Sequence, residues 1–443
     1  MKKLLKPIVV FFLTLEARLI LRKYKPKIIA ITGSVGKTSA KDAAYTAIAH
    51  ARAGRKNEKT LNSDIGVPLT VIGAGNAWES VSGWLSVLLA GVRCIISTCE
   101  YPKLLILEVG IDKPGDMRRL APWIRPHTVV FTGVPDLPTH GAFFESADAV
   151  LSEKAELVKY MQPTGTLILN GDDARARSLA YPSSRVMTYG LKSDNTLMAT
   201  HIEPLIARGQ PYGEDGGLFL WYRGVRFRVN HGDSSVSVEI EGALGDAQVL
   251  AALAGFAVGI SEGLDMVAIA KQFAHHTTPP GRMRLLNGLT RTTIIDDSYN
   301  ASPAAALSAL EALKALPVEG RRIAALGDMR ELGEKSAEAH TMIGERAAGI
   351  VDLLITVGEE SRILAQTASA HGLKSEQIRS YGYGESELAG KQLAKMLKPG
   401  DVVLVKGSQN KIRMERLVKE IMAEPARAKE LLVRQEPEWI AIP

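Results

Sequence analysis

The chain is poor in cysteine, and this scarcity excludes several classes of protein. Only Cys94 and Cys99 occur among its 443 residues, and they do not form a C-x-x-C pair. A disulfide framework or a zinc site is therefore not expected, and a reducing cytosol is the predicted compartment.

Long uninterrupted hydrophobic runs are also missing. Residues 4–21 are mostly apolar, but Lys6, Glu16 and Arg18 interrupt them, and no small-residue cleavage site follows. Neither a membrane span nor a signal peptide is predicted from such a stretch.

A second apolar stretch, residues 84–96, is broken by Arg93. For both stretches we predict a helix that either lies on a membrane surface or packs on the protein. Residues 1–26 thus form a separate apolar and basic segment, for which a peripheral membrane contact is one interpretation and ordinary packing the other.

The chain has no low-complexity tract and no recognised nucleic-acid-binding motif, so a nucleic-acid partner is not expected. Its 54 basic and 48 acidic residues leave a formal net charge of +6. This mild excess indicates a solvated surface, with a phosphate-rich ligand or an anionic membrane surface as the alternatives.

Strand and helix patterns alternate from residue 27 onward, which predicts an α/β fold. Antiparallel hairpins are predicted around Arg223-Gly224, and Pro279-Pro280-Gly281 then breaks the chain before the alternation restarts. We expect a phosphate-loop ATPase domain with a parallel sheet at 27–281 and a doubly wound, Rossmann-like domain at 282–443. The predicted strands are 27–32, 104–109, 128–132, 166–169, 292–295, 322–326, 353–357 and 402–405, and the clearest predicted helices are 37–49, 145–161, 246–260 and 264–274.

The strongest local motif is T-G-S-V-G-K-T-S at residues 32–39. It departs from G-x-x-x-x-G-K-[ST] because Ile31 stands where the first glycine belongs, but it lies between a predicted strand and a predicted helix. Lys37 is suited to balance β- and γ-phosphate charge, and the Thr38 hydroxyl to bind Mg²⁺. The predicted nucleotide-binding residues are Gly33, Ser34, Val35, Gly36, Lys37, Thr38 and Ser39. A kinase, a GTPase and a ligase all remain open.

Polar residues at later strand ends are candidates for the same site. Glu108 ends a buried strand and is suited to hold Mg²⁺. Asp296 and Asp328 end strands of the second unit, and Lys406 ends a third, which predicts a binding crevice at one sheet edge. His140 and Lys154 are not selected by sequence physics, because a lone histidine is usually structural and a helix lysine is usually a solvated cation.

Together these residues resemble the Mur ligases, most closely the MurF branch, which joins D-alanyl-D-alanine to a UDP-muramoyl tripeptide. The matching motifs, which run over most of the chain, are T-G-S-V-G-K-T-S, L-N-S-D-I-G-V-P, L-E-V-G, H-G-A-F-F-E-S, E-K-A-E, P-G-R-M, D-D-S-Y-N-A-S-P, L-G-D-M and V-K-G-S.

The resemblance implies roles for residues that the pattern alone leaves undecided. Lys154 would be carbamylated by CO₂ and would hold one of two Mg²⁺ ions, with Glu108 and His140 as further metal ligands. Asn62 would lie near the phosphates and the substrate. Positions in the C-terminal domain and at its hinge would serve nucleotide binding or contacts of the closed state; they are Arg282, Asp296, Asn300 and Lys406.

The resemblance also implies an activity: an ATP-dependent acid–amino-acid ligase of peptidoglycan synthesis that works through an acyl phosphate. The implied partners are D-Ala-D-Ala and a muramoyl peptide, and the expected protein is a cytoplasmic monomer, with the inner face of the membrane as an alternative location.

Three departures from the family pattern bear on this expectation. Only about 26 residues precede the first strand, so we expect the usual UDP-binding domain to be absent, and the acceptor stays open. Ala247-Gln248 replaces a His-Asn pair, and Gln409 replaces an arginine. The alternatives are a Mur-like ligase with another acceptor, as in folylpolyglutamate or cyanophycin synthetases, and a phosphate-loop nucleotide switch without ligase activity.

Overall fold

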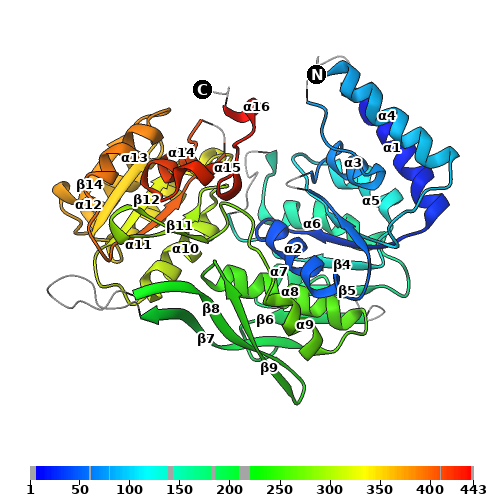
Figure 1. Ribbon diagram of the computed structural model, residues 1–443, viewed down its shortest axis with the longest axis horizontal. Coiled ribbons are helices and arrows are strands. Elements are labelled where there is room, and N and C mark those ends of the chain that lie inside the picture. Colours follow the sequence, from blue (N-terminus) through cyan, green and yellow to red (C-terminus); the bar gives the residue numbers. More distant parts are fainter. Residues whose placement is uncertain are drawn as a thin grey trace.

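The computed structural model describes residues 6–58, 61–78, 80–137, 143–180, 185–208, 220–409 and 411–440. These residues form two lobes, each built on a β-sheet with helices on both faces (Figure 1). The predicted α/β class, with a parallel-dominated sheet and a second sheet, is confirmed.

The first sheet has the strand order β2-β3-β1-β4-β5-β6-β7-β8-β9. Its strands pair in parallel from β2 to β7, and β7, β8 and β9 pair antiparallel. The strands are β1 (Lys27–Thr32), β2 (Gly54–Lys56), β3 (Leu104–Glu108), β4 (Thr128–Phe131), β5 (Thr166–Asn170), β6 (Arg185–Gly190), β7 (Leu197–Arg208), β8 (Leu220–His231) and β9 (Ser234–Glu241).

Helices cover both faces of this sheet, because its central strands are apolar on both sides. One face carries α1 (Lys6–Tyr24), α3 (Gly66–Ile72), α4 (Val81–Ile96), α5 (Asp116–Ile124), α6 (Ala147–Lys159) and α7 (Ala174–Arg177). The other face carries α2 (Lys37–Ile48), α8 (Asp246–Ser261) and α9 (Met266–Phe273).

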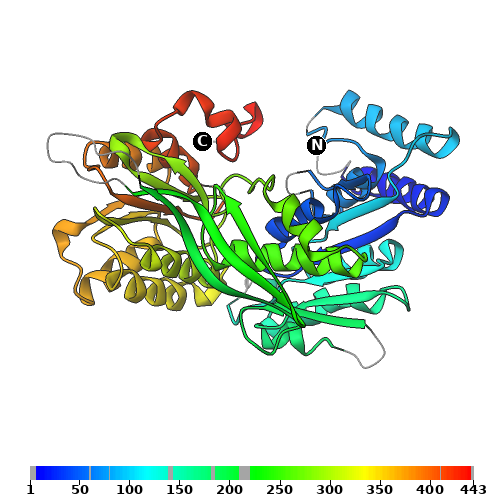
Figure 2. The ribbon, with the colours of Figure 1, turned by 60° about the horizontal axis from the view of Figure 1, so that its bottom comes forward.

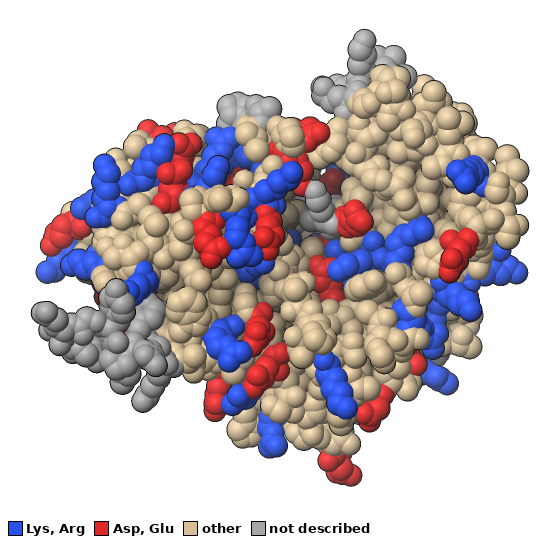
Figure 3. All heavy atoms as spheres, viewed as in Figure 1, with Lys and Arg blue, Asp and Glu red and all other residues tan. Residues whose placement is uncertain are grey.

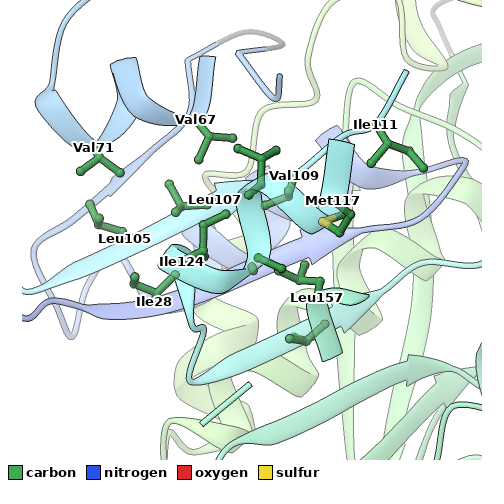
Figure 4. Close-up of a cluster of buried hydrophobic side chains, with 14 of the residues drawn as sticks. Ile28, Val67, Val71, Leu105, Leu107, Val109, Ile111, Met117, Ile124 and Leu157 are labelled. Atoms are coloured by element: carbon green, nitrogen blue, oxygen red, sulfur yellow. The ribbon is translucent and has the colours of Figure 1, made fainter. Parts of the chain in front are cut away.

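Alternation of side chains along β3 shows how one strand serves two cores. Leu105 and Leu107 point into the cluster that Val67, Ile124 and Leu157 complete (Figure 4). Leu104 and Ile106 point to the opposite face and pack beneath α2 and α8. The last residue, Glu108, is the polar end of an otherwise apolar strand, at the edge where parallel strands place functional groups.

The antiparallel part of the first sheet differs from the sequence prediction in one respect. No turn occurs at Arg223-Gly224, because β8 continues through both residues with only a register shift in its pairing with β7, and the hairpin turns at Gly232-Asp233. Gly232 has a positive φ of 54°, which a tight turn favours, whereas Gly224 lies where a Cβ would meet the Ile240 carbonyl oxygen at 1.9 Å. The glycine therefore marks a close approach of two strands, and the predicted antiparallel pairing is confirmed.

The second sheet has the order β10-β11-β15-β12-β13-β14 and is parallel except for the edge strand β10. Its strands are β10 (Arg284–Asn287), β11 (Thr293–Asp297), β12 (Arg322–Gly327), β13 (Leu353–Val357), β14 (Ile378–Tyr381) and β15 (Val402–Lys406). The helices are α10 (Pro303–Ala315), α11 (Ser336–Ala348) and α12 (Ser361–Ala370) on one face, α13 (Ser386–Ala394) and α14 (Met414–Ile421) on the other, and the short α15 (Ala428–Leu431) and α16 (Pro437–Ile440).

The long strands β7 and β8 extend from the first sheet toward the second lobe (Figure 2). The Tyr222 hydroxyl on β8 donates a hydrogen bond to the Pro317 carbonyl oxygen beyond α10. The backbone N–H of Leu220 donates to the Glu319 carboxylate. These contacts join the two lobes away from the phosphate loop.

Both apolar stretches near the N-terminus are helices, α1 and α4, and they lie side by side on the first lobe (Figure 1). The ammonium group of Lys23 donates hydrogen bonds to the carbonyl oxygens of Cys94, Ile95 and Ser97, at the end of α4. This lysine ties the two helices together. In the described part of the chain, no helix has the length and hydropathy needed to cross a bilayer.

The two cysteines are free thiols, yet they are neighbours. Their sulfur atoms lie 3.3 Å apart, and the Tyr24 hydroxyl lies 3.0 Å from Cys99 Sγ. Burial raises the pKa of the Cys94 thiol, whereas the hydrogen bond with Tyr24 lowers that of Cys99. The five-residue spacing in the sequence did not indicate this contact.

The contact between α1 and α4 buries the carboxyl group of Glu16. A Cβ at Gly91 would meet Glu16 Oε2 at 2.0 Å, and that oxygen has no hydrogen-bond partner in the described chain. Burial raises the pKa of Glu16 to about 7.

Glu16→Gln should therefore stabilise the protein at neutral and alkaline pH. An unfolded chain ionises this group near pH 4.3, so the wild-type stability falls as pH rises from that value to about 7 and then levels off. Urea unfolding at pH 4 and pH 8 should show the variant gaining about 1–2 kcal/mol over wild type at the higher pH and little at the lower. An equal gain at both values would contradict the burial of an ionisable group here.

Candidate functional site

The loop between β1 and α2 has the conformation that a phosphate-binding loop requires. Gly33 has φ 140°, and a Cβ there would meet Thr132 Oγ1 at 2.1 Å. Gly36 has φ 78° and directly precedes the first residue of α2. Both glycines are thus required by the backbone, and the amino end of α2 presents its N–H groups and positive dipole end to the loop.

Lys37 begins α2 and points back over the loop, where its ammonium group donates to the Ser34 carbonyl oxygen at 3.2 Å. Burial lowers its pKa, the charge of Arg282 lowers it further, and the carboxylates of Glu108 and Asp112 act in the opposite direction. Two buried hydroxyls of the loop, those of Thr32 and Ser34, have no hydrogen-bond partner among the described residues. The loop therefore offers a cation and free hydroxyl groups around one point.

Glu108 lies beside this loop and is held from two sides. Its backbone N–H donates to Asn57 Oδ1, and its Oε1 accepts a hydrogen bond of 2.7 Å from Asn62 Nδ2. Its other oxygen, Oε2, is buried without a partner in the described chain. A buried carboxylate oxygen left unpaired and oriented by a neighbouring amide suits a metal ion.

Lys154 is buried, contrary to the solvated cation that sequence physics predicts. It lies on α6 with 2% of its surface exposed, and no hydrogen bond or ion pair joins it to another described residue. Burial, and then the charge of Lys37, lower its pKa well below the usual value for lysine, while Asp112, Glu153 and Glu108 oppose this. The packing of α6 against α5, where Glu153 accepts the Met117 N–H at 2.8 Å, places this lysine in the site.

The structure thus brings Lys37, Glu108 and Lys154 into one electrostatic neighbourhood. His140 lies outside the described residues. Among the described residues, no three or more His, Cys, Asp or Glu side chains cluster closely enough to bind a metal ion. The unpaired Glu108 oxygen and the Thr38 hydroxyl nevertheless fit Mg²⁺, which prefers few protein oxygens together with phosphate oxygens.

Arg282 connects the phosphate loop to the second lobe. Its guanidinium donates to Thr38 Oγ1 at 3.4 Å and lies 4.0 Å from the centre of the Tyr299 ring. Gln248 Nε2 donates to the Arg282 carbonyl oxygen at 2.7 Å. Gly281, with φ 67°, precedes it and donates its N–H to Asp296.

The predicted residues of the second lobe form a network of their own. Asp296 is fully buried, accepts the N–H groups of Gly281 and Ser298, and has its pKa raised by burial to about 6. Lys406 donates to Asp297 at 2.5 Å and to the Asn300 carbonyl oxygen at 2.9 Å. These side chains shape the 296–300 loop beneath Arg282.

Three strand ends of this lobe meet at one sheet edge, as the sequence predicted. The Ser408 N–H donates to the Asp328 carbonyl oxygen, and its hydroxyl donates to the Ala301 carbonyl oxygen. The Asp328 carboxylate itself is occupied, because it accepts the Ser361 and Glu359 N–H groups and the Tyr383 hydroxyl. This aspartate therefore holds the start of α12.

Sequence reasoning missed two residues at the site. Asn57 follows the short strand β2, and only the parallel pairing of β2 with β3 places its amide against the end of β3. Asp112 is an exposed residue near the start of α5, and its charge acts on both Lys37 and Lys154. Neither residue lies in a pattern that indicates a function by itself.

A glycine-bearing phosphate loop and a second α/β lobe joined to it through Arg282 define a two-lobed nucleotide-binding protein. Family models place it more closely: the Mur ligase middle domain matches residues 31–257, and the Mur ligase glutamate ligase domain matches residues 281–409. The chain belongs to the Mur ligase family, and a Mur-type peptide ligase is the class of enzyme that this membership supports.

Relatives of known name agree with this assignment. The chain is 30% identical over 409 residues to the UDP-N-acetylmuramoyl-tripeptide–D-alanyl-D-alanine ligase of Mycobacterium leprae, covering 86% of this chain and 71% of the relative. It is 24% identical over 410 residues to the Bacillus subtilis ligase of the same name, with coverages of 92% and 79%. The crystal structure of MurF ligase from Thermotoga maritima in complex with ADP is similar, with a TM-score of 0.72 and 25% identity over 95% of this chain and 84% of that one. The resemblance to MurF that the motifs indicated is confirmed.

Proposed function

We propose that this chain is an ATP-dependent ligase that joins D-Ala-D-Ala to the terminal carboxylate of a muramoyl peptide in peptidoglycan synthesis, the reaction of class EC 6.3.2.10. The observation that carries the proposal is the convergence of Lys37, Glu108 and buried Lys154 at one phosphate loop. The names of the relatives support the choice of substrates.

The chemistry proceeds in two balanced steps. An oxygen of the substrate carboxylate attacks the γ-phosphorus of ATP, the bond to the β-phosphate oxygen breaks, and ADP leaves. The amine of D-Ala-D-Ala then attacks the acyl carbon, phosphate leaves, and the new amide nitrogen loses a proton. Lys37 neutralises phosphate charge in the first step, which lets an anionic carboxylate approach.

Thr38, Glu108, His140 and Lys154 are the residues that we propose to hold two Mg²⁺ ions. When bound, the metal neutralises phosphate charge that one lysine leaves uncompensated. Asn62 positions the Glu108 carboxylate through its 2.7 Å hydrogen bond.

We propose that CO₂ carbamylates Lys154, and the surroundings of this lysine support the proposal. Burial lowers the pKa of the amine and thereby favours its neutral form, which is the form that reacts with CO₂. The carbamate is an anion, so its formation places a negative charge near Lys37 where the amine had none. This explains why a lysine stands buried where a metal site needs a carboxylate.

Closure of the second lobe completes the proposed mechanism. We propose domains at 27–281 and 282–443, with a hinge at Gly281 and with Arg282, Asp296 and Asn300 near the nucleotide. Lys406 holds the loop that carries Asn300. An acyl phosphate is destroyed by water, so a site divided between two lobes protects the intermediate when they close.

Release of ADP tests the proposal. The protein is mixed with ATP, Mg²⁺, D-Ala-D-Ala and either a UDP-linked or a lipid-linked muramoyl tripeptide, with each substrate omitted in turn. We expect turnover and peptide product only when both organic substrates are present. Turnover that needs a different amine, such as glutamate, indicates the alternative ligase class, and turnover that ignores every amine indicates a nucleotide switch.

Asn62→Ala should weaken metal binding and leave the fold intact. Loss of a residue that orients a metal ligand typically costs 10–100-fold in metal affinity or activity. A Mg²⁺ titration of turnover should therefore require roughly 10- to 100-fold more metal. Asn287→Ala, an exposed amide on β10, is the matched control, and an unchanged Mg²⁺ requirement in Asn62→Ala would refute the role.

A further inference from the structure

Helices α1 and α4 present an apolar surface that the ligase chemistry does not use. Each carries a stripe at helical spacing, and together they hold more than half of the exposed large hydrophobic side chains in the described chain. Exposure reaches 63% at Phe11 and 78% at Ile96. The region over these two helices is largely free of charge in Figure 3. The α1–α4 surface consists of Ile8, Phe11, Phe12, Leu15, Leu19, Val81, Leu85, Leu89, Val92 and Ile96.

These helices are firmly attached to the protein by their opposite faces. Leu13 and Ile20 of α1, and Trp84 and Val87 of α4, belong to the core beneath the first sheet. Each helix is thus apolar on two faces, one of which is covered. The sequence left two interpretations open, packing on the protein or contact with a membrane, and the structure assigns packing to the inner face only.

The exposed charged side chains that α1 and α4 themselves carry are all of one sign. The exposed charged residues on the two helices are Lys6, Arg18, Arg22, Lys23 and Arg93, and Lys25 follows at the end of α1. The single acidic residue of the two helices, Glu16, is buried between them. An apolar surface on helices whose exposed charges are all positive is complementary to an apolar phase bordered by anions.

We propose that the α1–α4 surface docks on an anionic membrane surface. The apolar stripes enter the boundary between headgroups and acyl chains, and the lysine and arginine side chains contact lipid phosphates. The helices lie in the plane of the membrane, and the first lobe is held against it. This contact does not depend on the proposed ligase activity.

A second copy of the chain is a poorer occupant. A symmetric dimer through this surface would bring the basic side chains of two copies, Arg18, Arg22 and Arg93 among them, into one interface, with no exposed carboxylate on either helix to compensate. An anionic bilayer meets the same cations with opposite charge. The electrostatics therefore favour lipid.

Vesicle sedimentation with the full chain tests the proposal. Vesicles of phosphatidylcholine with about one third phosphatidylglycerol should bind the protein, and pure phosphatidylcholine vesicles should bind it at least about tenfold more weakly. High salt should weaken binding to the anionic vesicles, because the lipid and protein charges are then screened. Equal distribution in the supernatant with and without anionic vesicles would overturn the proposal.

Two matched variants distinguish vesicle binding through the α1–α4 surface from nonspecific hydrophobic adsorption. Phe11→Ser combined with Leu85→Ser and Leu89→Ser should reduce vesicle binding at least about tenfold and leave the melting temperature and ADP release unchanged. Val267→Ser combined with Leu388→Ser removes exposed apolar side chains elsewhere and should bind vesicles like wild type. If the triple variant instead converts a dimer to a monomer in sedimentation velocity and keeps its vesicle binding, the surface is an interface between copies and the proposal fails.

Discussion

Lys154→Met is expected to lower peptide ligation roughly 100- to 1,000-fold, and the folded protein should be no less stable than wild type. The activity falls because methionine cannot form the proposed carbamate and so cannot supply a carboxylate to the proposed metal site. The stability is kept because Lys154 is buried and makes no hydrogen bond or ion pair in the described chain, so methionine replaces a buried polar group without breaking a contact. We expect the free energy of unfolding to rise by about 1 kcal/mol at pH 7.

The pH dependence of that difference has a definite sign. The pKa of Lys154 is lowered in the folded state, so between this value and about 10.4 the unfolded chain binds the extra proton. Wild-type stability therefore rises with pH over this range, and the advantage of the methionine variant should shrink toward pH 10. Urea unfolding of both proteins at pH 7 and pH 9.5 measures it.

Lys159→Met is the control on the same helix. Its side chain is 57% exposed and pairs with Glu156, so its loss should leave ligation unchanged. Bicarbonate adds a second test: wild-type activity should fall in CO₂-depleted buffer and return with bicarbonate, and the Lys154 variant should not respond. A wild-type enzyme that ignores bicarbonate would contradict the carbamate, and a fully active Lys154→Met would remove the lysine from the mechanism.

Lys37→Ala should reduce ATP turnover about 1,000-fold or more, the range seen when a cation that contacts the transferred phosphate is removed. The ammonium group stands over the loop and close to Ser34, where no other lysine of α2 can replace it. Lys41, one turn further on, donates to the Asn57 carbonyl oxygen and is buried away from the loop. Single-turnover release of ADP with saturating substrates measures the chemical step, and an ATP titration measures binding.

The fold should tolerate this change. Burial lowers the pKa of Lys37, which means that the site disfavours its charged form, so the charged side chain contributes little to the stability of the fold. Lys271→Ala, on the exposed part of α9 in the same lobe, serves as the charge-matched control and should turn over at the wild-type rate. Undiminished turnover in Lys37→Ala would refute the phosphate-binding role of the loop.

Much of the fold was predictable, because the information is local. Apolar runs ended by polar residues predicted the strands β1, β3, β4, β5, β11, β12, β13 and β15 to within about two residues. The strands that were not predicted are the short strands β2, β10 and β14 at sheet edges, and the interior strands β6 and β7, whose apolar residues are interrupted by polar ones. The turn expected around Arg223-Gly224 was misplaced because a glycine is needed both in turns and where two strands approach closely. The sequence alone does not distinguish these two uses.

Some candidate site residues could likewise be identified from local sequence, and others could not. Lys37 and Thr38 were identified by a motif whose geometry is local, and Glu108 by its place at a strand end. Lys154 was singled out only through the resemblance to the Mur ligases. Asn57 and Asp112 were not singled out at all, because Asn57 meets Glu108, and the charge of Asp112 lies near Lys37, only through the packing of separate elements.

The amino-acid sequence by itself determined where the phosphate loop lies, where most of the central parallel strands lie and which helices have apolar faces, because each depends on neighbours along the chain. Tertiary structure alone decided that Lys154 is a buried amine, that Glu108 keeps one oxygen unpaired, and that one face of α1 and α4 is covered while the other is not. The burial of a side chain and its distance from other charges depend on the residues packed against it, and these residues are distant in the sequence.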